Sequence, residues 1–124
     1  MDQIVHTRAA LALVDADRAL RHALSFSFAT EGIDVDAFGD ARSVLGAVRE
    51  TPWPCLVADY ALPDMNGLEL FERLRATGRV AHAILTATNP SRSLLSRAEA
   101  ARVDLIEKPL LSDQLLRRVR GVLM

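Results

Sequence analysis

Cysteine, lysine and net charge are the scarce features of this chain of 124 residues. Its one cysteine, Cys55, excludes a disulfide within the chain. No apolar run reaches the roughly 18 residues of a membrane span, and the first residues lack the charged segment and long apolar core of a signal peptide. A net charge of −1 gives no basic excess for contacts with DNA phosphates. We therefore expect a cytoplasmic protein with no membrane segment and no direct contact with nucleic acid.

The size and composition are those of one globular domain. Half of the residues are hydrophobic, so a proper core can form, and a quarter are charged. We expect a single domain over residues 1–124, with a core of about residues 8–124.

Short apolar runs alternate with segments of helical spacing along the chain. The predicted strands cover residues 9–14, 33–37, 55–59, 81–86 and 103–107. The predicted helices cover residues 18–30, 41–50, 68–75, 91–102 and a final segment that begins after Ser112. Asp40 and Ser112 are the expected caps of two helices, and residues 52–54 (Pro-Trp-Pro) are expected to interrupt the chain before the third strand.

This alternation predicts an α/β fold with a doubly wound, five-stranded parallel sheet and helices on both faces. Strands that are buried on both faces are continuously apolar, whereas edge strands can alternate. In the second strand, Ile33 and Val35 alternate with Asp34 and Asp36, which is typical of a half-exposed edge. The first, third and fourth strands are continuously apolar. Their pattern predicts the strand order 2-1-3-4-5.

Polar side chains end the predicted strands at the edge where such sheets bind ligands. Asp15 and Asp17 follow the first strand, Asp59 ends the third, Thr86 the fourth, and Lys108 follows the fifth. Clustered carboxylates with no nearby histidine or cysteine suit Mg²⁺, and a carboxylate beside it can accept a phosphoryl group. Lys108 is the one lysine among 15 basic residues, and a compact ammonium suits a tight site. Taken singly, Asp15 and Asp17 are also compatible with turn or cap residues, Asp17 more so than Asp15, and Thr86 with an ordinary strand residue.

Three segments resemble one known family. Residues 56–70 (LVADYALPDMNGLEL) look like a phosphoacceptor strand followed by a turn with proline and glycine. Thr86 and Ala87 match a hydroxyl position with a small residue behind it, and residues 106–109 (IEKP) match a lysine-proline signature. Over nearly its whole length the chain resembles the response-regulator receiver family, the CheY-like domains of bacterial two-component signalling.

The resemblance implies a phosphorylation switch rather than an enzyme. Asp59 would receive a phosphoryl group from a sensor histidine kinase or a phosphotransfer protein. Asp15, Asp59 and the backbone carbonyl of Ala61 would hold Mg²⁺, while Thr86 and Lys108 would contact the phosphoryl oxygens.

The resemblance also assigns neighbours and partners. Ala87 and Pro109 would lie next to the phosphate, and the Lys108–Pro109 bond is often cis in the family. The switching face would be formed by the fourth helix, the fifth strand and the fifth helix. An output domain or protein, or a second copy in a phosphorylation-dependent homodimer, would bind that face.

Three positions depart from the family pattern. Ala16 stands where a second acid usually binds the metal, so we expect weaker Mg²⁺ binding, or compensation by Asp17. Leu105 replaces an aromatic residue that moves with the hydroxyl, which alters the coupling. Ala101 replaces the glycine that commonly ends the fourth helix and could strain the entry to the fifth strand.

Two other classes of protein remain as alternatives. An atypical receiver, poorly or not phosphorylated, would act as a constitutive protein-interaction module, and Ala16 and Leu105 favour it. A Mg²⁺-dependent phosphatase or hydrolase would need a further acid–base group and usually a cap domain, for which the chain is too short. A flavin-binding protein is disfavoured because no loop rich in serine and threonine follows the first strand.

Overall fold

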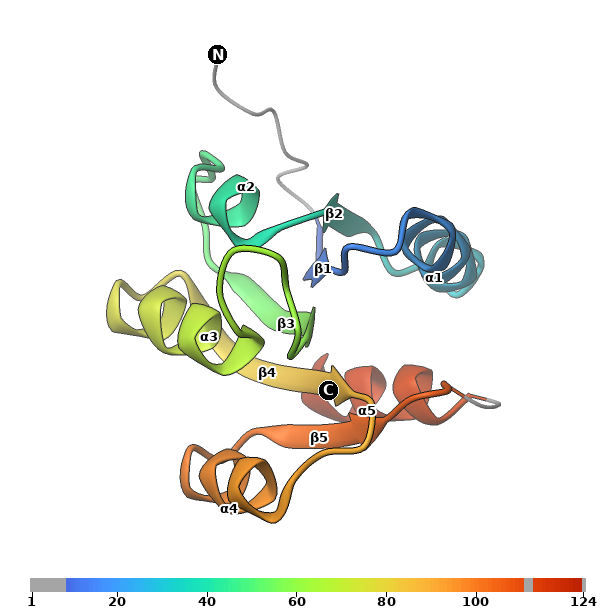
Figure 1. Cartoon of the computed structure of the whole chain (residues 1–124). Coiled ribbons are helices and arrows are strands. Elements are labelled where there is room, and N and C mark those ends of the chain that lie inside the picture. The colour runs from blue at the N-terminus through green and yellow to red at the C-terminus, as the bar shows by residue number, and fades with distance from the viewer. Residues whose placement is uncertain (1–8, 111–112, 124) are drawn as a thin grey trace.

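The computed structural model describes residues 9–110 and 113–123 and confirms the predicted fold. Five parallel strands lie in the order β2-β1-β3-β4-β5 (Figure 1). The strands are β1 (Leu11–Val14), β2 (Val35–Phe38), β3 (Trp53–Asp59), β4 (Val80–Ala87) and β5 (Asp104–Glu107). The helices are α1 (Arg18–Thr30), α2 (Ala41–Leu45), α3 (Gly67–Ala76), α4 (Arg92–Ala100) and α5 (Gln114–Leu123).

Helices cover both faces of the sheet, with α1 and α5 on one side and α2, α3 and α4 on the other (Figure 1). Successive strand residues point to opposite faces, so β1 sends Leu11 and Leu13 toward α1 and α5, and Ala12 and Val14 toward the other three helices. All four side chains are fully buried. This double burial is why the central strands are continuously apolar, and each buried leucine contributes about 2 kcal/mol to stability.

Side-chain caps begin four helices of the described structure. The side chains of Asp17, Asp40, Asn66 and Ser91 accept hydrogen bonds from backbone N–H groups in the first turns of α1, α2, α3 and α4. Such a cap stabilises a helix by about 1 kcal/mol. The prediction for Asp40 is therefore confirmed, whereas Ser112 lies outside the described residues.

Glycine in the left-handed region ends two helices. Gly32 after α1 and Gly78 after α3 have φ angles of 76° and 70°. At both helix ends, the N–H of the glycine and the N–H of the following residue donate to carbonyls of the last helical turn, at 2.8 to 3.0 Å. This arrangement satisfies carbonyls that the helix end would otherwise leave unpaired.

The second helix is shorter than predicted. It ends at Leu45 with Gly46 as its C-cap, instead of continuing to residue 50. Beyond Gly46 the chain turns so that Arg49 reaches inward, donating to Asp36 at 3.3 Å and to the carbonyl of Ala9 at 2.7 Å. If α2 continued through residue 50, Arg49 would lie in a different position relative to Asp36 and Ala9.

Two predictions about strands need correction. Asp36 does not face solvent, because it is 5% exposed and accepts a hydrogen bond from Trp53 Nε1 at 2.8 Å. The break expected at residues 52–54 includes only Pro52, since β3 begins at Trp53. Pro54 is tolerated because it lies at the start of β3, one residue before the pairing of Cys55 with Leu11 of β1.

None of the described helices is long and apolar enough to cross a membrane.

Candidate functional site

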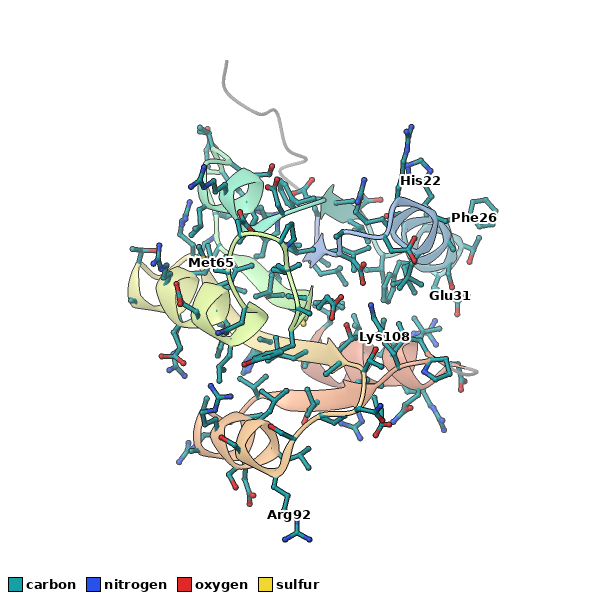
Figure 2. The ribbon with its side chains drawn as sticks, in the orientation of Figure 1. His22, Phe26, Glu31, Met65, Arg92 and Lys108 are labelled. Carbon is teal, nitrogen blue, oxygen red and sulfur yellow. The ribbon has the colours of Figure 1, made fainter. Side chains whose placement is uncertain are left out.

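Two aspartates and the single lysine meet at the carboxyl edge of the sheet. Asp15 directly follows β1, Asp59 ends the neighbouring β3, and Lys108 follows β5. Lys108 Nζ lies 2.9 Å from Asp15 Oδ2 and 3.1 Å from Asp59 Oδ2. Its backbone N–H bonds to the carbonyl of Ala87 at 2.8 Å, which fixes Lys108 to the end of β4. Figure 2 shows Lys108 at this edge.

The three charges of this cluster stabilise one another. The side chains of Asp15, Asp59 and Lys108 are 5%, 15% and 19% exposed, so water screens them little. Burial acts to lower the pKa of Lys108, but hydrogen bonds and charge attraction from Asp15 and Asp59 outweigh it, and the pKa is raised. Lys108 is therefore a cation, and the cluster of two carboxylates and one ammonium carries a net charge of about −1.

The loop between β1 and α1 holds Asp15 firmly. Asp15 Oδ1 accepts a hydrogen bond from the N–H of Asp17 at 2.8 Å, and Arg21 donates to the Asp15 carbonyl at 2.8 Å. The Asp17 side chain accepts from the N–H of Leu20 at 3.1 Å and so caps α1. Ala16 between them is exposed. The structure thus places Asp17 on the helix end rather than with Asp15 and Asp59.

A residue on β4 lies beside the end of β3. Thr86 pairs in register with Asp59 and is 3% exposed. The N–H of Tyr60 donates to the Thr86 carbonyl at 2.8 Å, so the backbone after Asp59 is tied to β4. Ala87 behind it is also buried. Four predicted residues, Asp15, Asp59, Thr86 and Lys108, therefore come together at one edge.

The turn after Asp59 requires a glycine at residue 67. A Cβ at Gly67 would lie 2.5 Å from the carbonyl oxygen of Asp59, which is closer than real contacts allow. The N–H of Gly67 donates to the Tyr60 carbonyl at 2.8 Å. Gly67 begins α3, so it lets this helix start directly against the strand that ends in Asp59.

The comparison with known proteins identifies the family. Residues 11–120 match the family described as the response regulator receiver domain. The chain belongs to this family. It is the receiver domain of a two-component response regulator, a signalling module rather than a classical enzyme.

Individual relatives agree with this assignment. The DNA-binding response regulator MtrA of Mycolicibacterium paratuberculosis is 34% identical over 114 residues, which are 92% of this receiver domain and 51% of MtrA. A response regulator receiver protein from Pseudoalteromonas atlantica is similar with a TM-score of 0.81 and 26% identity, over 91% of this chain and 95% of that one. A CheY-like receiver domain protein from Methanospirillum hungatei has the same fold, with a TM-score of 0.81, 24% identity and 91% coverage of both chains. The chain spans about half the length of curated relatives such as MtrA.

Few side chains in the described part of this receiver domain could hold a metal ion. Among the described residues, no three histidine, cysteine, aspartate or glutamate side chains are grouped as a metal site. Asp15 and Asp59 remain as two close carboxylates, bridged by Lys108. Ala61, the expected carbonyl ligand, follows in the exposed turn, where its N–H lies 3.4 Å from Asp59 Oδ1. Two carboxylates with a carbonyl are enough for Mg²⁺, which commonly keeps several waters.

The remaining predicted positions of the receiver domain lie around β5. Leu105 is half-buried and packs against the core on the α4 side. The Lys108–Pro109 bond is cis, as the family resemblance implied, and Pro109 is exposed. At the end of α4 the backbone differs from the expectation, because Ala101 keeps a right-handed conformation and Arg102 has a φ of 60°.

The sequence reasoning missed two contacts of the turn after β3. Asp64 accepts hydrogen bonds from the N–H groups of Ala41 at 3.0 Å and Arg42 at 2.8 Å, so it joins this turn to the start of α2. Arg97 of α4 donates to the hydroxyl of Tyr60 at 3.2 Å. Both contacts join residues far apart in sequence, so no spacing rule signals them.

A cavity opens beside Asp59. Its volume is about 290 Å³, and its walls are the turn after β3 and the connection from β4 to α4. The lining residues are Asp59, Tyr60, Ala61, Ala87, Thr88, Asn89, Pro90, Ser91 and Leu94. Of the two carboxylates in the cluster, Asp59 is therefore the one that lines this cavity.

Proposed function

We propose that Asp59 is the phosphoacceptor of this receiver domain. Asp15 is the less suitable of the two carboxylates, because its Oδ1 accepts from Asp17 and its Oδ2 from Lys108. Asp59 Oδ2 is also bonded to Lys108, but Oδ1 has only the long contact to the Ala61 N–H. Asp59 also borders the cavity. The observation that carries the proposal is this difference between two neighbouring carboxylates.

The transfer would convert a carboxylate into an acyl phosphate. An Asp59 oxygen attacks the phosphorus of a phosphohistidine, and the P–N bond breaks as the O–P bond forms. The electron pair stays on the departing imidazole nitrogen, which takes up a proton. Lys108 and the Thr86 hydroxyl would bond the phosphoryl oxygens, whose added charge is roughly −1.5 to −2.

Asp15, Asp59 and the carbonyl of Ala61 are the groups that would hold Mg²⁺. A bound Mg²⁺ supplies positive charge to the phosphoryl oxygens. Ala16 contributes no carboxylate, and Asp17 would have to leave the N–H of Leu20, giving up a cap of about 1 kcal/mol. We therefore expect Mg²⁺ to bind more weakly than at a site with three acids.

The partners follow from the family and from the surface of this domain. The phosphoryl donor would be a sensor histidine kinase or a phosphotransfer protein in the cytoplasm. The chain as a single receiver unit would present α4, β5 and α5 to an output domain or to a second copy. Since MtrA is a DNA-binding response regulator about twice as long, an output domain joined to this receiver is a consistent arrangement.

The alternative is an atypical receiver that works as an interaction module without phosphorylation. The absence of a three-acid group among the described residues favours it, and Lys108 already forms an ion pair with each of the two carboxylates. The two functions differ in whether Asp59 reacts.

Intact mass after incubation with acetyl phosphate distinguishes them. We expect the wild type to gain the mass of one phosphoryl group, with dependence on Mg²⁺, and Asp59→Asn to gain none. Asp15→Asn is a matched control, since it should gain mass slowly through weaker metal binding. No gain at any Mg²⁺ concentration would contradict the phosphoacceptor proposal and favour the interaction module.

Two variants test the metal site. Ala16→Asp should shift the Mg²⁺ dependence of phosphorylation to lower concentration. Asp17→Asn keeps a helix cap but removes the charge, so an unchanged Mg²⁺ dependence would exclude Asp17 from metal binding.

A further inference from the structure

Helix α4 is attached to the sheet by few contacts. It buries only Leu94 and Ala98, whereas α3, which is similar in length, buries five residues. The N-terminal end of α4 lines the cavity beside Asp59 through Ser91 and Leu94. A helix with little buried surface and a cavity beside it can shift at low cost.

One side chain crosses from the acceptor turn to this helix. Tyr60 directly follows Asp59, and its backbone is fixed on both sides, through its N–H to Thr86 and through its carbonyl to the Gly67 N–H. Its hydroxyl accepts a hydrogen bond from Arg97 Nη2 at 3.2 Å. In the described parts of the chain, this is the one side-chain hydrogen bond that joins residues 59–66 to α4.

The geometry of Tyr60 makes it responsive to Asp59. Tyr60 is the residue next to Asp59, and its N–H and carbonyl belong to the hydrogen bonds of the acceptor turn, so a rearrangement of this turn would carry the ring with it. The ring packs partly against the core and ends at Arg97. Leu105 on β5 has no polar group with which to make such a link.

We propose that the Tyr60–Arg97 hydrogen bond couples the state of Asp59 to the position of α4. This proposal rests on phosphorylation of Asp59 as proposed above. The bond joins the turn that carries the acceptor to a face on which an output partner would bind. It biases an existing equilibrium of α4 rather than creating a new state.

The first measurement is hydrogen exchange of α4 amides without phosphoryl donor. Tyr60→Phe and Arg97→Met should each speed exchange in α4 by about fivefold, the effect of one ordinary hydrogen bond, and leave α1 unchanged. The double variant should exchange no faster than either single variant, because both remove the same bond.

A matched arginine provides the control. Arg92 lies on the same helix and points away from the body of the domain (Figure 2). Arg92→Met removes the same charge without touching Tyr60, so α4 exchange should stay near the wild-type rate. Equal effects of Arg92→Met and Arg97→Met, or effects of Tyr60→Phe and Arg97→Met that simply add, would overturn the proposed link.

The second measurement adds acetyl phosphate and Mg²⁺ and follows intact mass and exchange together. We expect Tyr60→Phe to gain a phosphoryl group as the wild type does. The change in α4 exchange on phosphorylation should, however, be about fivefold smaller in this variant than in the wild type. A full α4 response in phosphorylated Tyr60→Phe would refute the coupling. If the wild type itself gains no mass, the phosphoacceptor proposal fails and the coupling fails with it, while the first measurement still reports on the bond.

Discussion

Replacing Arg102 by glycine should stabilise the domain. Three helices, α1, α3 and α4, end with the same pair of backward hydrogen bonds, but only α4 does so without glycine. Arg102 has a φ of 60°, close to the 76° of Gly32 and the 70° of Gly78. Its N–H bonds to the Glu99 carbonyl at 3.0 Å, and the next N–H, of Val103, bonds to the Ala98 carbonyl at 2.9 Å. The backbone conformation is therefore imposed by the helix end and not by the residue.

The magnitude follows from two opposing effects. A residue with a Cβ in the left-handed region costs about 1–2 kcal/mol. Glycine removes that cost but increases the entropy of the unfolded chain, which takes back about 0.5–1 kcal/mol. The Arg102 side chain is exposed and, in the described structure, has no hydrogen bond or ion pair to lose. We expect a net gain near 1 kcal/mol, or about 4 °C in Tm for a domain of this size.

Urea unfolding and thermal melting followed by circular dichroism measure this gain. Arg102→Ala is the control, because it removes the side chain but keeps the Cβ, and it should leave stability nearly unchanged. Gly78→Ala should lower stability by about 1 kcal/mol for the same reason in reverse. The reasoning is refuted if Arg102→Ala stabilises as much as Arg102→Gly, or if Arg102→Gly has no effect.

Three further predictions concern single contacts. Gly67→Ala should destabilise the domain by about 2 kcal/mol or more, measured by urea unfolding, because its Cβ would press on the Asp59 carbonyl. Trp53→Phe should cost about 2 kcal/mol in the same assay, because buried Asp36 loses the indole N–H. For Asp64, burial acts to raise the pKa, but backbone hydrogen bonds, including those from Ala41 and Arg42, and the charge of Arg42 together outweigh it, and the pKa is lowered. Its stabilising effect is therefore present above the unfolded pKa of about 4 and is lost as pH falls through the lower folded value, so Asp64→Ala should destabilise at neutral pH and much less in acid.

The fold could be predicted because its main determinants are local. Continuous apolar runs such as residues 55–58 identify strands with helices on both faces, and alternation in residues 33–36 identifies an edge. The meeting of Asp15, Asp59 and Lys108 could be predicted as well, because the carboxyl ends of parallel strands share one edge of the sheet. Each of the three residues ends a strand or directly follows one. No knowledge of the side-chain contacts was needed for this step.

The misses come from contacts between distant residues. Burial of Asp36 depends on Trp53 and Arg49, which lie 17 and 13 positions away, and the pattern of its own strand gives no sign of them. The strained residue after α4 was expected at Ala101 but lies at Arg102. A one-residue error of this kind arises because a sequence pattern marks the end of a helix only approximately, whereas the hydrogen bonds decide which residue turns.

The β1–α1 loop shows why the site chemistry is harder to predict than its location. Asp17 was interpreted both as a cap residue and as a substitute metal ligand, and both uses are chemically reasonable. The structure shows the cap, with the Asp17 carboxylate on the Leu20 N–H and its own N–H on Asp15. The two uses compete, because a carboxylate that turns toward Asp59 leaves the helix end unpaired. Metal affinity here would depend on the balance between a cap of about 1 kcal/mol and the attraction of a divalent ion, and residue identity alone does not determine that balance.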